Sequence, residues 1–156
     1  MPTPDVMPYI LLEILPECDG QDMAESAVHR SMKAIARAEL ERDGYEVVEE
    51  PLFPPGRRVS WSSYRPDLLG YRREADREEV VLVECETRPN MKRLERKNHG
   101  SVFLQSFLFR ASSIRRILAV PQGRLGAVDT RVRREWEVWV VGRNRLVQRT
   151  GTMLVS

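Results

Sequence analysis

The chain has 156 residues, of which 42% are apolar and 31% charged, and its formal net charge is +2. This length and composition exclude a disordered chain and predict one folded domain, over residues 1–156, with a core of its own. The net charge is too small to indicate nucleic-acid binding by itself. Only a local basic patch can indicate it.

The basic residues are strongly biased toward arginine. Of 25 Lys and Arg residues, only Lys33, Lys92 and Lys97 are lysines. Arginine forms bidentate contacts with phosphates and carboxylates, which fits nucleic-acid binding or dense ion pairing. A GC-rich coding sequence or growth at high temperature explains the bias equally well.

The cysteines and the apolar segments indicate a cytoplasmic protein. Cys18 and Cys85 lie far apart in unlike contexts, which predicts free thiols in a reducing compartment. The apolar segment Met7–Leu15 is too short for a membrane span, contains Glu13, and lacks the basic start and cleavage site of a signal peptide. We therefore expect no membrane association.

One helix is predicted in the first sixty residues. The expected elements are a strand or arm at 9–15, a helix at 22–43, a short strand at 45–48 and a loop at 49–60. Asp22 and Glu25 form a capping-box pattern that predicts the start of the helix, and Gly44 is a suitable C-terminal stop.

A β-hairpin is predicted next, with strands at 66–71 and 79–86 and a charged turn at 72–77. The continuous apolar run Val80–Val83 is typical of a central strand that is covered on both faces. We assume that the hairpin closes symmetrically between Ala75 and Asp76. The register is then Tyr71 opposite Val80, Leu69 opposite Leu82, and Asp67 opposite Glu84.

Helices and strands alternate in the rest of the chain. The expected elements are a helix at 91–109 capped by Asn90, a strand at 114–120, a helix at 125–135, and a terminal hairpin at 136–141 and 145–148. The apolar side chains of that hairpin, Trp136 and Trp139 among them, predict either core packing or a dimer surface. This order of elements predicts an α/β sandwich with a mixed sheet.

In the assumed register three acids share one face of the hairpin. Glu84 and Glu86 lie about 6–7 Å apart, because side chains alternate along a strand. Asp67 lies on the same side, with its Cβ atom about 5 Å from that of Glu84. Neighbouring buried carboxylates repel each other, and Mg²⁺ or Mn²⁺ removes that penalty. The alternative is a structural cluster at the strand end that pairs with nearby arginines.

These residues resemble the signature of the PD-(D/E)XK nuclease superfamily. Arg65-Pro66-Asp67 is followed, after sixteen residues, by Glu84-Cys85-Glu86 on an apolar strand, and the order of elements over residues 23–120 is similar too. The resemblance implies a restriction-endonuclease-like three-layer sandwich with a central mixed β-sheet flanked by helices, as in archaeal Holliday-junction resolvases. Such nucleases are often homodimers, so we expect a homodimer here.

The resemblance also implies a function, the metal-dependent hydrolysis of DNA phosphodiester bonds by an endo- or exodeoxyribonuclease. Asp67 and Glu84 would hold Mg²⁺ or Mn²⁺, which polarises the scissile phosphate and lowers the pKa of a bound water. Glu86 stands where the superfamily has lysine, and we expect it to orient or deprotonate that water. Glu25 resembles a helix-borne acid that assists metal binding, although a capping-box acid belongs at the same position.

The missing lysine leaves other functions open. A catalytically inactive nucleic-acid-binding or assembly protein that keeps the nuclease fold fits the same pattern. Lys92 or Lys97, on the following helix, is a candidate to supply the lysine. An enzyme acting on other phosphates is a third possibility, but the chain lacks a Gly-rich phosphate loop. His29 and His99 have no partner at metal-ligand spacing, so we predict no histidine-based mechanism.

Two groups of basic residues are predicted to contact DNA. The first follows the acidic strand and would meet phosphates beside the metal: Lys92, Arg93, Arg96 and Lys97. The second, Arg57 and Arg58, lies in a loop with Trp61 and Tyr64, which combines charge with base stacking. The alternatives are a solvated helix face paired with Glu95 and a loop that packs its own aromatic side chains.

Overall fold

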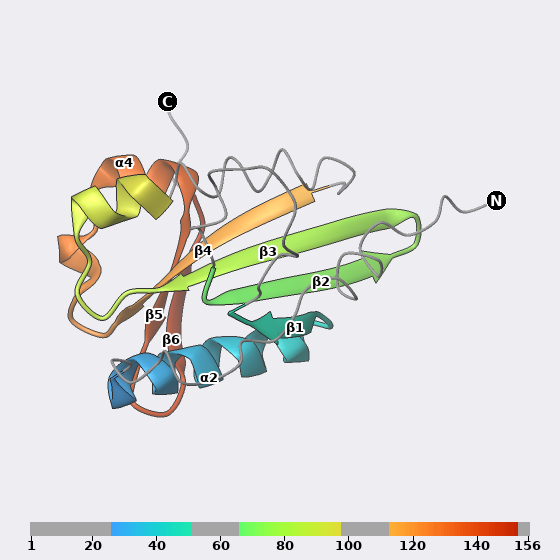
Figure 1. Ribbon diagram of the computed structural model, residues 1–156, viewed down its shortest axis with the longest axis horizontal. Coiled ribbons are helices and arrows are strands. Elements are labelled where there is room, and N and C mark those ends of the chain that lie inside the picture. Colours follow the sequence, from blue (N-terminus) through green and yellow to red (C-terminus); the bar gives the residue numbers. More distant parts are fainter. Residues whose placement is uncertain (1–25, 51–65, 98–112, 153–156) are drawn as a thin grey trace, which may run out of the picture.

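A mixed six-stranded β-sheet forms the centre of the computed structural model, which describes residues 26–50, 66–97 and 113–152 (Figure 1). The strands are β1 (Glu46–Glu49), β2 (Leu68–Glu74), β3 (Arg77–Cys85), β4 (Ser113–Pro121), β5 (Glu137–Val141) and β6 (Leu146–Thr150). They lie in the sheet in the order of the sequence. Strands β3, β4 and β5 are parallel to one another, and the remaining pairs are antiparallel.

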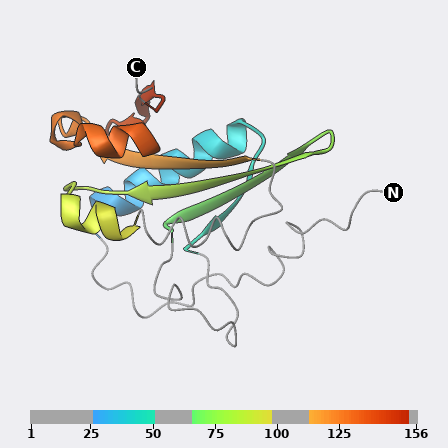
Figure 2. The ribbon, with the colours of Figure 1, turned by 90° about the horizontal axis from the view of Figure 1, so that it is seen from above.

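Helices cover both faces of this sheet. Helix α2 (Ala27–Arg42) packs on one face, against alternate residues of the central strands such as Val81, Val83 and Ile117. The helical residues 91–97 and helix α4 (Thr130–Glu135) belong to a second cluster on the other face, with Leu118 and Val138. Figures 1 and 2 show these layers in two views. The predicted α/β architecture, a three-layer sandwich around a mixed sheet, is confirmed.

Helix α2 buries one stripe of its surface and begins later than predicted. Met32, Ala36 and Leu40 are spaced four residues apart, and all three are buried against the sheet. Ser26 is the N-cap, because its hydroxyl accepts a hydrogen bond from the backbone of His29 at 3.1 Å. The prediction that this helix begins at Asp22 is therefore wrong. Residues 22–25 themselves lie outside the described ranges.

The register of the predicted hairpin is confirmed. Tyr71 pairs with Val80 and Leu69 with Leu82, and Ala75 forms the turn with a φ of 57°. The same register, continued beyond the strand, places Asp67 opposite Glu84. The predicted charged turn over residues 72–77 is wrong except at its tip, since β2 and β3 extend through it. Cross-strand pairs of opposite charge stabilise this extension, namely Arg72 with Glu79, Arg73 with Glu78, and Glu74 with Arg77.

The strands after the hairpin and the start of the helix predicted over residues 91–109 match the prediction, whereas residues 98–109 lie outside the described ranges. Asn90 caps the helical residues 91–97, accepting from the backbone of Arg93 at 3.2 Å. The helix predicted over residues 125–135 is divided into the 3₁₀ turn η2 (Leu125–Ala127) and α4. Asp129 causes the division, because its carboxylate accepts from the backbone of Arg131 and caps a new helix. Trp136 and Trp139 are both core residues, 1% and 0% exposed.

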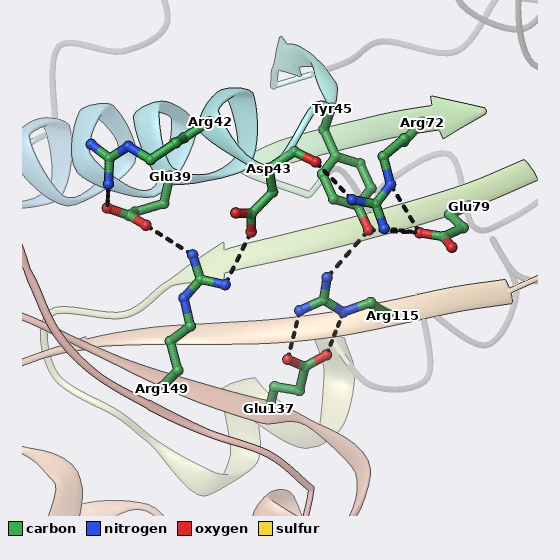
Figure 3. A network of polar contacts seen from close by, with 9 residues as sticks. All are labelled: Glu39, Arg42, Asp43, Tyr45, Arg72, Glu79, Arg115, Glu137 and Arg149. Atoms are coloured by element: carbon green, nitrogen blue, oxygen red, sulfur yellow. Dashed lines mark hydrogen bonds and ion pairs between the residues drawn. The ribbon is translucent and has the colours of Figure 1, made fainter. Parts of the chain in front are cut away.

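A network of arginines and acids joins the C-terminal end of α2 to the sheet (Figure 3). Arg149 of β6 donates to the carboxylates of Asp43 and Glu39, and Arg72 of β2 donates to the backbone carbonyl of Asp43. These arginines are engaged within the protein, which favours dense ion pairing as one reason for the arginine bias. No helix in the described part of the chain is long and apolar enough to span a membrane.

Candidate functional site

Two buried glutamates mark the C-terminal end of the central strand β3. Glu84 is 0% exposed and Glu86 is 2% exposed, and the backbone N–H of Glu86 donates to the carbonyl of Ala119 in β4 at 2.9 Å. Cys85 between them is a free, buried thiol in the core beneath α2, as predicted. Because side chains alternate along a strand, both glutamates face the opposite layer, which contains residues 91–97.

Lys97 reaches these two glutamates from the helical residues 91–97. Its Nζ atom lies 2.6 Å from Oε2 of Glu84 and 2.5 Å from Oε1 of Glu86. Arg93, one helical turn earlier, lies 3.1 Å from the other oxygen of Glu86. The sequence identified Lys97 only as a candidate for the missing lysine. The structure brings its ammonium group between the two acids.

Asp67 lies just before β2, at the same end of the sheet. Its Oδ2 atom accepts a hydrogen bond from the backbone N–H of Cys85 at 2.7 Å. Nε2 of His29, in the first turn of α2, lies 3.4 Å from the same oxygen. The sequence did not predict this contact of His29. Spacing along the chain does not show that α2 packs near the start of β2.

Burial and charge set the protonation of these acids. Burial and the negative charge of Asp67 raise the pKa of Glu84 to about 8, although Lys97 opposes the shift. Burial also favours a raised pKa for Asp67, but the contacts with His29, Lys97 and the Cys85 N–H outweigh it, so that this pKa is lowered. Burial disfavours the charge on Lys97, yet the surrounding carboxylates raise its pKa. The site therefore combines an ionised Asp67 and a charged Lys97 with a Glu84 carboxyl that binds a proton more readily than usual.

This donor set fits an open metal site better than a closed one. Within the described residues, no three Asp, Glu, His or Cys side chains converge to enclose a metal ion. Oε1 of Glu84, however, is buried and accepts no hydrogen bond from that part of the chain. Mg²⁺ commonly binds one or two carboxylates and completes its shell with waters and substrate phosphates. Asp67 and Glu84 fit that mode of binding.

The other predicted site residues do not join this cluster. Lys92 and Arg96 are exposed on the helical segment 91–97, and among the described residues neither has an ion-pair partner. Glu25, Arg57 and Arg58 lie outside the described ranges. Their predicted roles stay predictions.

Comparisons with known proteins identify no family for this chain. No family model matches the sequence, and no curated protein matches it. Two solved structures are similar in fold. An XisH family protein from Nostoc punctiforme is 12% identical, with a TM-score of 0.45, over 78% of this chain and 99% of that one. An fdxN element excision controlling factor protein from Anabaena variabilis is 14% identical, with a TM-score of 0.46, over 81% of this chain and 100% of that one.

Proposed function

We propose that this protein is a metal-dependent nuclease that uses Asp67 and Glu84 to hydrolyse DNA phosphodiester bonds. The observation that carries the proposal is the contact of Lys97 with Glu84, beside Asp67, at the end of the central strand. The group consists of a carboxylate pair suited to a hard divalent cation and an ammonium group suited to a phosphate or a water. The resembled motif has a lysine on the strand, where this chain has Glu86. Lys97 would supply that positive charge from the neighbouring helical segment.

Each side chain has a distinct part in the proposed reaction. Asp67 and Glu84 would hold Mg²⁺ or Mn²⁺, which supplies Lewis-acid polarisation of the phosphate. Lys97 stays charged and would stabilise negative charge on the scissile phosphate or orient the attacking water. Glu86 forms ion pairs with both Lys97 and Arg93, and so would act chiefly by fixing the position of Lys97. This proposal replaces direct action of Glu86 on the water.

DNA is the proposed substrate because exposed cations lie on the helical segment that also carries Lys97. Lys92 and Arg96 follow the acidic strand on the same helical segment as Lys97, so that a phosphate backbone at the site would pass them. The homodimer stays a prediction.

A cleavage assay tests this proposal. The purified protein is incubated with labelled single-stranded, double-stranded and branched DNA in Mg²⁺ or Mn²⁺, with Asp67→Asn and Glu84→Gln as test variants. Glu95→Gln is the control, since Glu95 is an exposed acid on the same helical segment as Lys97. We expect cleavage by the wild type and the control, and a loss of at least about a hundredfold in both test variants. Tight DNA binding without cutting by the wild type in either metal contradicts the proposal.

The second candidate is a catalytically inactive DNA-binding or assembly protein, and one observation favours it. Lys97 and Arg93 already compensate the charge of Glu84 and Glu86, so that the cluster is stable without a metal. Such a protein would bind DNA equally well in EDTA and in Mn²⁺. It would also show no heat of Mn²⁺ binding that Asp67→Asn removes.

A further inference from the structure

Helix α2 reaches Asp67 from the layer opposite Lys97. His29 and Lys33 are four residues apart and so project from one face of the helix. Nε2 of His29 lies 3.4 Å from the Asp67 carboxylate, and Nζ of Lys33 lies 3.3 Å from the Glu50 carboxylate. Glu50 is itself joined to Asp67, since its backbone N–H donates to the Asp67 carbonyl at 2.8 Å. The helix therefore contacts both the side chain of Asp67 and the residue bonded to its backbone.

The contact with His29 bears on the orientation of the carboxylate. His29 and the backbone N–H of Cys85 approach the same oxygen, Oδ2, at 3.4 and 2.7 Å. Two donors from different elements restrict rotation of the carboxylate about its Cβ–Cγ bond. They hold Oδ2 toward the end of β3 and toward α2.

Attachment of the helix does not need this contact. Met32, Ala36 and Leu40 already anchor α2, each 3% exposed or less. His29 does not belong to that core cluster, and its side chain is 22% exposed. His29 instead contacts Asp67, a candidate metal ligand, from the first turn of α2. Side chains in such contacts commonly orient the metal-binding residue.

We infer that His29 is a positioning residue for Asp67 in the metal site, and this inference rests on the proposed function. It acts through Asp67, by donating Nε2–H to Oδ2. The loss of such a partner typically costs ten- to a hundredfold in metal affinity or activity.

The test compares three variants in two assays. His29→Ala removes the donor, whereas His29→Gln places an amide N–H where Nε2 lies. Val28→Ala is the matched control, since Val28 is the preceding residue in the same helical turn and is 54% exposed. Mn²⁺ binding to the free protein is measured by calorimetry, and DNA cleavage is measured as a function of metal concentration.

We expect His29→Ala to weaken Mn²⁺ binding about tenfold, and His29→Gln to stay within about threefold of the wild type. The control should bind as the wild type does. In cleavage, the half-maximal metal concentration should rise for His29→Ala by the same factor, with little change at saturating metal.

Two results overturn the positioning role alone. One is wild-type Mn²⁺ affinity in His29→Ala. The other is a folded His29→Gln protein that binds as weakly as His29→Ala, because the imidazole itself would then be required. A wild-type protein that neither binds Mn²⁺ nor cleaves DNA overturns the proposed function as well, so the two failures are distinguishable.

Discussion

Nζ of Lys97 lies 2.6 Å from Oε2 of Glu84, although the two residues come from different layers of the sandwich. The same ammonium group contacts Glu86, which occupies the strand position where the resembled superfamily has its lysine. The helical segment 91–97 therefore supplies a positive charge beside Glu84 and Glu86. In the proposed function, Glu86 supports that charge.

Replacing Lys97 with Met tests the contact, because Met keeps a long apolar side chain and removes the charge. Three acids then lose their shared counter-charge, and we expect the free energy of unfolding to fall by about 2 kcal/mol. This is less than the cost of breaking a fully buried pair, because the Lys97 side chain is 24% exposed. Urea denaturation at pH 7 measures the loss, and DNA cleavage should be lost with it.

Lys92→Met is the control for that experiment. Lys92 is exposed on the same helical segment, so its replacement should leave the free energy of unfolding almost unchanged. Equal effects of the two substitutions would show that the contact with the acids contributes nothing to stability.

Stability should depend on pH through Glu84. Its pKa is raised from an ordinary value of 4.5 to about 8 by burial and by Asp67, so the folded state keeps a proton that the unfolded state has lost. The stabilisation from this proton is fully present below pH 4.5 and disappears as the pH rises through 8. Each pKa unit corresponds to about 1.4 kcal/mol, so the wild type should lose a few kcal/mol across this window.

Glu84→Gln provides the reference, because glutamine has the same shape and does not titrate. The free energies of unfolding of both proteins are measured in EDTA at pH 5 and pH 8. The wild type should lose more stability than the variant over this interval. Parallel losses in the two proteins would refute a raised pKa for Glu84.

The hairpin that carries the acids was predictable from local sequence. The alternation of side chains has a period of two, and symmetric closure at Ala75 and Asp76 fixes every pair from the turn to Asp67. The apolar run Val80–Val83 identified the central strand, because only a strand covered on both faces is apolar throughout. These features depend on neighbouring residues alone.

The contacts of Lys97 and His29 with the acids were not predictable in this way. Sequence spacing shows which residues share a helical face, but the layer that a helix covers depends on long-range packing. The start of α2 was missed for a local reason: both Asp22 and Ser26 are good N-cap residues, and the pattern alone does not choose between them. The capping-box pattern favoured Asp22, whereas the N-cap of α2 is Ser26.

The Tyr45 hydroxyl links two ion pairs far from the acids, and its removal should affect stability without affecting function. It donates to Glu79 at 3.1 Å and accepts from Arg115 at 3.2 Å, while Arg115 also forms a bidentate pair with Glu137 (Figure 3). Tyr45→Phe deletes both hydrogen bonds to charged partners, which should lower the free energy of unfolding by about 1.5 kcal/mol.

DNA cleavage by Tyr45→Phe should equal that of the wild type. Glu79 and Glu84 lie on the same strand, five residues and therefore about 16 Å apart. Urea denaturation and the cleavage assay are run on the same preparation. A large loss of cleavage at unchanged stability would show that this network is coupled to the acidic cluster.

The exposed cations beside the acids should contribute to DNA binding through phosphates. We expect the double variant Lys92→Ala/Arg96→Ala, made in the Asp67→Asn background to prevent cutting, to bind DNA about tenfold more weakly at moderate salt. Each lost phosphate contact lowers the slope of log affinity against log salt by about 0.9, so the slope should fall by nearly two. Fluorescence anisotropy over a range of salt concentrations measures both quantities.

The matched control is Arg143→Ala/Arg145→Ala, which removes two exposed charges from the turn between β5 and β6. Equal weakening by the two double variants would indicate attraction by net charge alone, and would remove the helical segment 91–97 from the proposed DNA path.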